Sequence, residues 1–412
     1  MKVIISTGQG RLHLIESAKA IKKAGVEVNV ITGWVPPAYL PDALLNFIGG
    51  LVGRTNLAYG FRKRSPKELT KEELSGNSIA EFILQLLFIF SKFYFIKKSQ
   101  AALIGWKIFG LSTKKYIKNS DVFHVRSGAG FRAIEKAKKK GMVVLVDHSA
   151  AHPLEIYNQL LKIYKPNKIP VEPHKGLWKL VIDDCKASDY LLVNSDYVKK
   201  SFIKHGFKKE RIFVIPLGIR KDFFSLKSNY EVKSKYKFLY TGTLNKWKGL
   251  DLLIETAELL YKKNIIFEFH LIGSISKELI IPNNLIEAGF IKLHGHVPQD
   301  KLKSFLKDSD IYIFPSYCEG SSQALKEAMS AGLPVIATEQ SGAPIIDGVN
   351  GLIIEDDSSA EIFKALIKLM DDESLREKIG LNAAFTIKNG HTWDIYGKDV
   401  SKLYQELINE KK

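Results

Sequence analysis

Short apolar runs alternate with segments of helical spacing along the chain. The run KVIIST (2–7) precedes a glycine turn, LHLIESAKAIKKAG (12–25) has apolar residues at helical spacing, and VEVNVIT (26–32) is a second run. Continuous apolar runs are typical of parallel strands buried on both faces. The order strand, helix, strand therefore predicts the opening of a doubly wound α/β sheet.

The same order begins again in the second half, with the run KFLYTG (237–242), the helical segment LDLLIETAELLYKK (250–263) and the run IIFEFHLIG (265–273). We therefore predict two Rossmann-like domains that face a central cleft, residues 1–218 and 219–412. The polar segment 220–236 is interpreted as the linker. The last segment, 392–412, is predicted to be a helix near the domain junction.

Charge is distributed unevenly between these halves. Residues 1–218 hold 36 of the 61 basic and 17 of the 44 acidic residues, a balance of +19, whereas the remainder balances at −2. Such asymmetry indicates an anionic partner for the first half. Without a nucleic-acid-binding motif, an anionic membrane is favoured over nucleic acid. Two cysteines are too few for a disulfide framework and fit a cytoplasmic protein.

The most apolar stretch is IAEFILQLLFIFSKFYFIKK (79–98). Polar residues interrupt it, so a transmembrane span is not expected. Its aromatic residues and terminal lysines suit a helix in the membrane interface, and a buried packing helix is the alternative. The N-terminal apolar run is too short for a signal peptide.

The segment SYCEGSSQALKEAMSAGLP (316–334) carries two carboxylates, Glu319 and Glu327, around the predicted start of a helix. Ser321 or Ser322 is expected to cap this helix, and Gly332 to end it. Helix-start amides attract anions, and Lys248 follows the first strand of the same half. These groups could hold a diphosphate, and the two carboxylates could accept hydrogen bonds from the hydroxyl groups on either side of it. The arrangement therefore predicts a nucleotide-sugar site. Solvated surface charges are the alternative.

These residues also carry a family resemblance. The segments GTLNKWKGLDLLIETA, HGHVPQDKL, DIYIFPSYCEGSSQALKEAMSAGLPVIAT, DGVNGLII and VNSDYVKKSFIKHGFKKERIFVIPLGI resemble family 4 of the glycosyltransferases, whose Glu-x7-Glu element is its most recognisable feature. The resemblance implies the GT-B fold and transfer of a sugar from a nucleoside-diphosphate sugar with retention of configuration. It implies no metal and no cofactor.

The resemblance assigns roles to residues of the second half. Lys248 and Glu319 are the implied catalytic residues, since Lys248 would neutralise the departing diphosphate and Glu319 would contact the donor sugar. Glu327 would hold the ribose hydroxyls. The remaining donor-binding positions are Gly242, Thr243, His296, Val297, Gly320, Ser321 and Ser322. Thr243 replaces an arginine that is frequent in the family.

The acceptor side is expected in the first half, at Gly8, Gly10, His124, Arg126 and His152. Strand alternation predicts that the side chains of His124 and Arg126 point the same way. Gly8 and Gly10 do not fit a dinucleotide-binding motif, because His13 stands where its third glycine belongs.

We therefore expect a metal-independent glycosyltransferase in cell-envelope polysaccharide or glycolipid synthesis. Its acceptor would be lipid-linked or a saccharide, and it would lie on the inner face of the cytoplasmic membrane. A nucleotide-sugar epimerase and a non-catalytic nucleotide-sugar binding protein are the alternatives.

Overall fold

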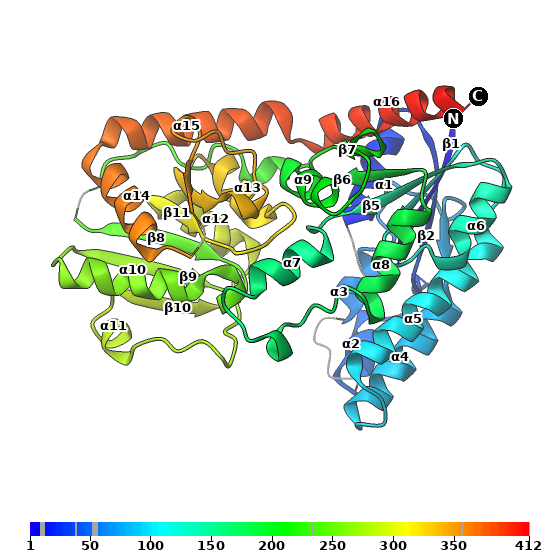
Figure 1. The fold of residues 1–412 in the computed structure, drawn as a ribbon, viewed down its shortest axis with the longest axis horizontal. Helices are drawn as coiled ribbons and strands as arrows, with labels where there is room; N and C mark the ends of the chain where they lie inside the picture. The colour runs from blue at the N-terminus through cyan, green and yellow to red at the C-terminus, as the bar shows by residue number, and fades with distance from the viewer. Residues whose placement is uncertain (9–12, 38, 52–56, 233, 356, 412) are drawn as a thin grey trace.

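The computed structural model describes residues 1–411 apart from 9–12, 38, 52–56, 233 and 356. Figure 1 shows two α/β lobes side by side, each built on its own sheet. No helix in the described part of the chain is both long and apolar enough to cross a membrane.

In the first lobe, the described residues form seven parallel strands in the order β3-β2-β1-β4-β5-β6-β7. The strands are β1 (Lys2–Gly8), β2 (Glu27–Thr32), β3 (Leu74–Gly76), β4 (Val122–Arg126), β5 (Val143–His148), β6 (Tyr190–Val193) and β7 (Ile212–Val214). The helices are α1 (His13–Lys23), α2 (Asp42–Leu51), α3 (Leu57–Arg62), α4 (Ser78–Lys92), α5 (Lys98–Thr113), α6 (Phe131–Lys139), α7 (Pro153–Leu160), α8 (Gly176–Ala187) and α9 (Asp196–Lys204).

In the second lobe, the described residues form six parallel strands in the order β10-β9-β8-β11-β12-β13. The strands are β8 (Tyr236–Thr241), β9 (Phe267–Ile272), β10 (Ile291–Gly295), β11 (Ile311–Phe314), β12 (Val335–Thr338) and β13 (Leu352–Ile354). The helices are α10 (Leu250–Lys262), α11 (Asn283–Glu287), α12 (Gln299–Asp308), α13 (Gln323–Ala331), α14 (Ser359–Asp371) and α15 (Glu373–Gly390). The expectation of two doubly wound parallel sheets is confirmed.

The last helix, α16 (Trp393–Lys411), returns to the first lobe (Figure 1). Its buried face, which includes Tyr396 and Tyr404, packs with α1 and one face of the first sheet. Gly397 lets the two helices approach closely, since a Cβ there would lie 2.2 Å from the Ala20 carbonyl oxygen. Only the start of this helix therefore lies at the junction, where Ile219 pairs with Thr392.

The polar segment 220–236 is not a free linker. Phe223 and Tyr230 are buried within it, and the amides of Ser225 and Lys227 donate hydrogen bonds to the end of α13. The few apolar residues of this run are enough to hold it against the second lobe, which corrects the interpretation of the segment as a linker.

Candidate functional site

Lys248 lies in a 3-10 turn, Lys246–Lys248, that follows β8. The Asn245 side chain caps this turn and accepts a hydrogen bond from the Lys248 amide at 2.9 Å. Gly249 ends the turn with a φ of 73°, and a Cβ there would lie 2.1 Å from the Pro315 carbonyl oxygen. Because only glycine allows this approach, the turn is held against the exit of β11.

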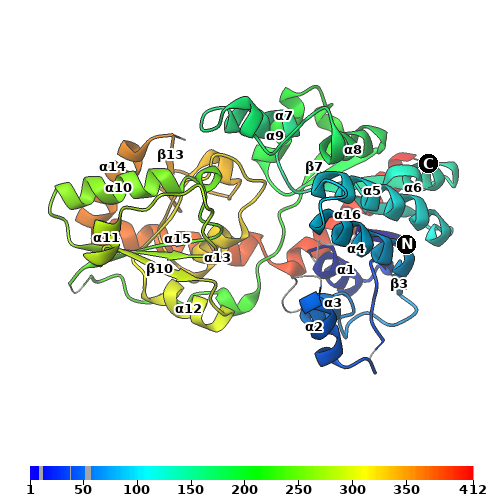
Figure 2. The same cartoon turned by 90° about the horizontal axis from the view of Figure 1, so that it is seen from below.

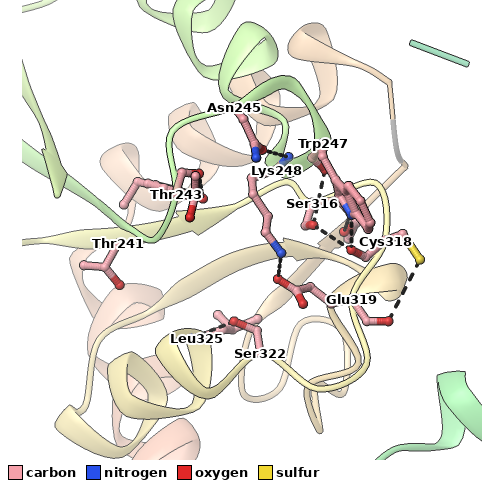
Figure 3. A network of polar contacts seen from close by, with 12 residues as sticks. Thr241, Thr243, Asn245, Trp247, Lys248, Ser316, Cys318, Glu319, Ser322 and Leu325 are labelled. Atoms are coloured by element: carbon pink, nitrogen blue, oxygen red, sulfur yellow. Dashed lines mark hydrogen bonds and ion pairs between the residues drawn. The ribbon is translucent and has the colours of Figure 1, made fainter. Parts of the chain in front are cut away.

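Glu319 lies on the loop after β11, opposite this turn. The Trp247 indole donates a hydrogen bond to the Cys318 carbonyl at 2.7 Å, and the Tyr317 amide donates one to the Trp247 carbonyl at 3.1 Å. The two loops thus bring the Lys248 ammonium into an ion pair with the Glu319 carboxylate, as Figure 3 shows. The side chains are 22% and 23% exposed, so the pair remains open to a ligand.

At Gly320 this loop contacts the first lobe. A Cβ at Gly320 would lie 1.8 Å from the Ser149 carbonyl oxygen, and the Ser195 hydroxyl donates a hydrogen bond to the Gly320 carbonyl. Glu319 is therefore at the contact between the lobes. Ser321, two residues after Glu319, lines the cavity between the two lobes.

Ser322 is the N-cap of α13, as predicted for Ser321 or Ser322. Its hydroxyl accepts a hydrogen bond from the Leu325 amide at 3.2 Å. Its own amide donates to the Ser341 carbonyl at 3.0 Å. This amide is already used within the protein, which corrects the expectation that it meets sugar or phosphate.

Glu327 lies on α13 and lines a cavity of about 710 Å³ between the two lobes. Ser149 and Asn194 of the first lobe line the same cavity. Burial raises the pKa of Glu327 to about 7, and the nearby Arg220 guanidinium opposes this shift. Both glutamates thus lie at the cleft rather than on an outer surface.

The other predicted donor positions follow β8 and β10. Gly242 and Thr243 are exposed, and Figure 3 shows Thr243 in the same region as Lys248. His296 is exposed as well. Val297, in contrast, is 9% exposed and packs in the core of the second lobe, which corrects its assignment to the donor-binding positions.

His124, predicted on the acceptor side, is fully buried in the first lobe. Its ring Nδ1 lies 2.6 Å from the Tyr404 hydroxyl of α16, and its Nε2 lies 3.7 Å from a carboxylate oxygen of Asp147. The ring is enclosed by protein on this face of the sheet. The prediction that His124 meets an acceptor is corrected accordingly.

Arg126 does not share the direction of His124. Its guanidinium carbon lies 4.0 Å from the ring centroid of Trp106, which comes from α5. That helix packs on the face of the sheet opposite α16. Arg126 is the last residue of β4, and its long side chain reaches Trp106 although alternation from His124 predicts the other face. Gly8 is next to Arg126, with a φ of 66°, and Gly10 lies outside the described residues.

His152 is a helix cap. Its Nδ1 accepts a hydrogen bond from the Leu154 amide at 3.2 Å, and its ring stacks on His205 with centroids 4.5 Å apart. Burial lowers the pKa of His152 to about 3, so the ring is neutral near pH 7. The ring fills space in the first lobe, which corrects its assignment to the acceptor side.

Sequence reasoning missed His13, the first residue of α1. This side chain lines the interdomain cavity, and its Nε2 lies 3.2 Å from an Asp147 carboxylate oxygen. Burial alone would raise the pKa of Asp147, but the neighbouring imidazole rings of His13 and His124 hold it below its ordinary value. No local signal could have found this pair, because His13 begins the helix after β1, whereas Asp147 lies in β5, which is separated from β1 by β4 in the sheet.

Two Rossmann-like sheets facing a cleft define the GT-B class of fold. The solved structure of Anabaena HepE in complex with UDP resembles the whole chain, with a TM-score of 0.63 at 14% identity and coverage of 98% of this chain and 100% of that one. The crystal structure of TarM resembles the chain with a TM-score of 0.68 at 13% identity, and 99% of each chain is covered.

Sequence comparisons agree with the fold. The family described as "Glycosyl transferases group 1" matches residues 222–384, and "Glycosyltransferase Family 4" matches residues 80–223. An uncharacterised glycosyltransferase of Methanocaldococcus jannaschii is 29% identical over 68% of this chain and 72% of its own length. The capsular polysaccharide biosynthesis glycosyltransferase CapM of Staphylococcus aureus is 26% identical over 61% of this chain and 71% of its own length. The chain belongs to the family 4 glycosyltransferases.

Proposed function

We propose that this protein transfers a sugar from a nucleoside-diphosphate sugar to an acceptor, with retention of anomeric configuration and without a metal. The observation that carries the proposal is the Lys248–Glu319 pair at the carboxyl edge of the second sheet. Ligands of open parallel sheets bind at this edge. Anabaena HepE, which has the same fold, was solved with UDP-glucose.

The proposed donor lies with its diphosphate at Lys248. As the glycosyl–phosphate bond breaks, negative charge grows on the leaving diphosphate, and a fixed ammonium stabilises that charge. The diphosphate replaces Glu319 as the partner of Lys248, which releases the carboxylate to accept hydrogen bonds from hydroxyl groups of the donor sugar. Glu327 accepts hydrogen bonds from the ribose hydroxyls in the same way.

The proposed acceptor is lipid-linked or a saccharide of the cell envelope and binds in the cleft of the first lobe. CapM, one relative of the chain, is named for capsular polysaccharide biosynthesis. The balance of +19 over residues 1–218 supports docking on the anionic inner face of the cytoplasmic membrane.

Thermal-shift screening against UDP-, GDP- and CMP-linked sugars tests the donor class, because a ligand that binds the native state raises its stability. We expect stabilisation by one base series, equal with and without EDTA. The product of the reaction with an acceptor should keep the anomeric configuration of the donor by NMR. Conversion of the donor sugar in the absence of acceptor would instead indicate an epimerase.

A further inference from the structure

An apolar groove of about 410 Å³ lies in the first lobe between α2, α3 and α4. Leu45 and Phe61 form part of its buried floor, and the Trp34 ring meets Phe61 edge-on at a centroid distance of 5.3 Å. Phe82 and Leu86 line it from α4 and are 70% and 38% exposed. Figure 2 shows α2 and α3 together at one end of this lobe.

Two polar side chains of the groove, Glu81 and Gln85, are engaged within the protein itself. Glu81 is buried and pairs with the Arg64 guanidinium at 3.0 Å, and the Gln85 amide donates to the same carboxylate at 2.5 Å. Since charge and hydrogen-bonding capacity are already matched there, a ligand in the groove meets hydrocarbon rather than polar side chains.

The short helix α3 joins this groove to the interdomain cavity. Leu57 and Phe61 line the groove, whereas Tyr59 and Lys63 line the cavity that also holds Glu327. The Lys63 ammonium lies 4.2 Å from the centre of the Tyr59 ring. Apolar and cationic surfaces are therefore only two residues apart, which suits a ligand with a hydrocarbon chain and an anionic head.

The surroundings of the groove favour an amphiphile over a protein segment. The turn after α4 exposes three successive aromatic side chains, Phe93, Tyr94 and Phe95, which are 64%, 96% and 81% exposed. Lys97 and Lys98 follow them directly. Exposed aromatic residues beside lysines are typical of a surface in the membrane interface, where a single lipid chain can leave the bilayer for the groove.

We propose that this groove holds the hydrocarbon chain of a lipid acceptor, whose anionic head group lies at Lys63 and whose hydroxyl reaches the cleft. The inference rests on the proposed function and deepens it, because it names the class of acceptor. The Coulombic attraction of Lys63 orients the head, and burial of the chain supplies the affinity.

The test uses n-dodecyl phosphate below its micellar concentration, with n-butyl phosphate and inorganic phosphate as references, in calorimetric titrations of the full chain. We expect one dodecyl phosphate per protein. The eight additional methylene groups should strengthen binding over butyl phosphate by at least about 100-fold. Equal affinities for the two alkyl phosphates would overturn the inference.

Leu86→Asp should weaken dodecyl phosphate at least about tenfold by placing a charge in the groove. Leu381→Asp is the matched control, since Leu381 is 53% exposed on α15 of the other lobe, and it should bind as the wild type does. Lys63→Ala should weaken dodecyl phosphate by roughly fivefold. Unchanged binding in the Leu86 variant, with its thermal unfolding intact, would contradict the assignment.

Two further measurements separate this inference from its alternatives. Binding to vesicles of phosphatidylglycerol without binding of monomeric dodecyl phosphate would mean that the surface contacts a bilayer and holds no single chain, which overturns the proposal. Nucleotide-sugar stabilisation should be equal in the wild type and in Leu86→Asp. If nucleotide sugars stabilise neither protein, the proposed function fails, whatever the alkyl phosphates do.

Discussion

At the scale of single residues, the central feature is a cation that is already paired. The Lys248 ammonium contacts the Glu319 carboxylate, and both groups belong to loops fixed by hydrogen bonds to Asn245 and Trp247. A diphosphate carries more charge than one carboxylate and can displace it. The geometry therefore holds the Lys248 ammonium in place, where the proposed donor would meet it already positioned.

Lys248→Ala should lower kcat by about 100-fold or more, because it removes a fixed charge from the leaving group. KM for the nucleotide sugar should change much less. The matched control is Lys246→Ala in the same turn, which should retain most of the activity. Steady-state kinetics with the donor found by thermal shift measure both values. Equal losses in the two variants would argue against a special role for Lys248.

Glu327 makes stability depend on pH. Its pKa of about 7 lies above the ordinary value of 4.5, so the native state holds a proton that the unfolded chain releases between these values. Its contribution is fully present below pH 4.5 and is lost as the pH rises to about 7. Between pH 4.5 and 8, the wild type should lose about 3 kcal/mol more than Glu327→Gln.

Urea unfolding of both proteins at several pH values measures this difference. Stability curves that run parallel across the interval would mean that the Glu327 carboxyl group is not buried as described. The same variant should bind nucleotide sugars more weakly, because an amide is a poorer acceptor for hydroxyl groups than a carboxylate.

At the scale of elements, α16 determines how the first lobe is completed. Its apolar face closes the core beside α1, and the helices touch at Gly397. Gly397→Ala should destabilise the protein by about 2 kcal/mol, since the added methyl group meets the Ala20 carbonyl.

Gly390→Ala provides the control. A Cβ at Gly390, the last residue of α15, would meet nothing within 4 Å. This substitution should be neutral or stabilise by up to about 1 kcal/mol, because alanine favours a helix more than glycine does. Thermal unfolding of Gly397→Ala and Gly390→Ala measures the two changes in stability. A neutral Gly397→Ala would contradict the close packing of α1 and α16.

The elements that sequence reasoning predicted best are those whose pattern is decided locally. The apolar runs at 2–7 and 237–242 became β1 and β8, and the segment 250–263 became α10 within one residue at its end. Ser322 is the N-cap of α13 and Gly332, with a φ of 92°, is its C-cap, as capping chemistry predicts.

What the sequence could not provide depends on contacts between distant segments. The side chains of His124 and Arg126 were expected to point the same way. Instead, the His124 ring contacts the Tyr404 hydroxyl, and the Arg126 guanidinium stacks on the Trp106 ring. The pairing of His13 with Asp147 spans 134 residues. Burial of His152 likewise results from contact with α9 and the residues after it, which no local pattern records.

At the scale of the whole molecule, the lobes meet at more than the junction where Ile219 pairs with Thr392. Beside the contact at Gly320, the Tyr164 hydroxyl of the first lobe donates to Glu278 of the second at 2.7 Å, and Trp247 packs against the cluster around α7. The cleft therefore has one side sealed by direct contact and another side open as the cavity at Glu327.

Gly320→Ala should disturb this arrangement without unfolding either lobe. A methyl group there overlaps the Ser149 carbonyl, so the lobes must separate locally. Turnover should fall by about 100-fold, the cost of misplacing reacting groups by roughly 1 Å. Thermal unfolding should resemble that of Gly390→Ala, and wild-type turnover in Gly320→Ala would mean that the contact is dispensable.

The pairing of Ile219 with Thr392 has a consequence for how the chain can be divided. The Ile219 amide donates a hydrogen bond to the His391 carbonyl at 2.7 Å, so the chain leaves the first lobe and re-enters it at almost the same point. Topologically, the second lobe is an insertion into the first. Excising residues 220–391 and joining the cut ends with a few glycines should leave a first lobe that folds by itself, whereas dividing the chain once at its middle would separate α16 from the lobe that it completes.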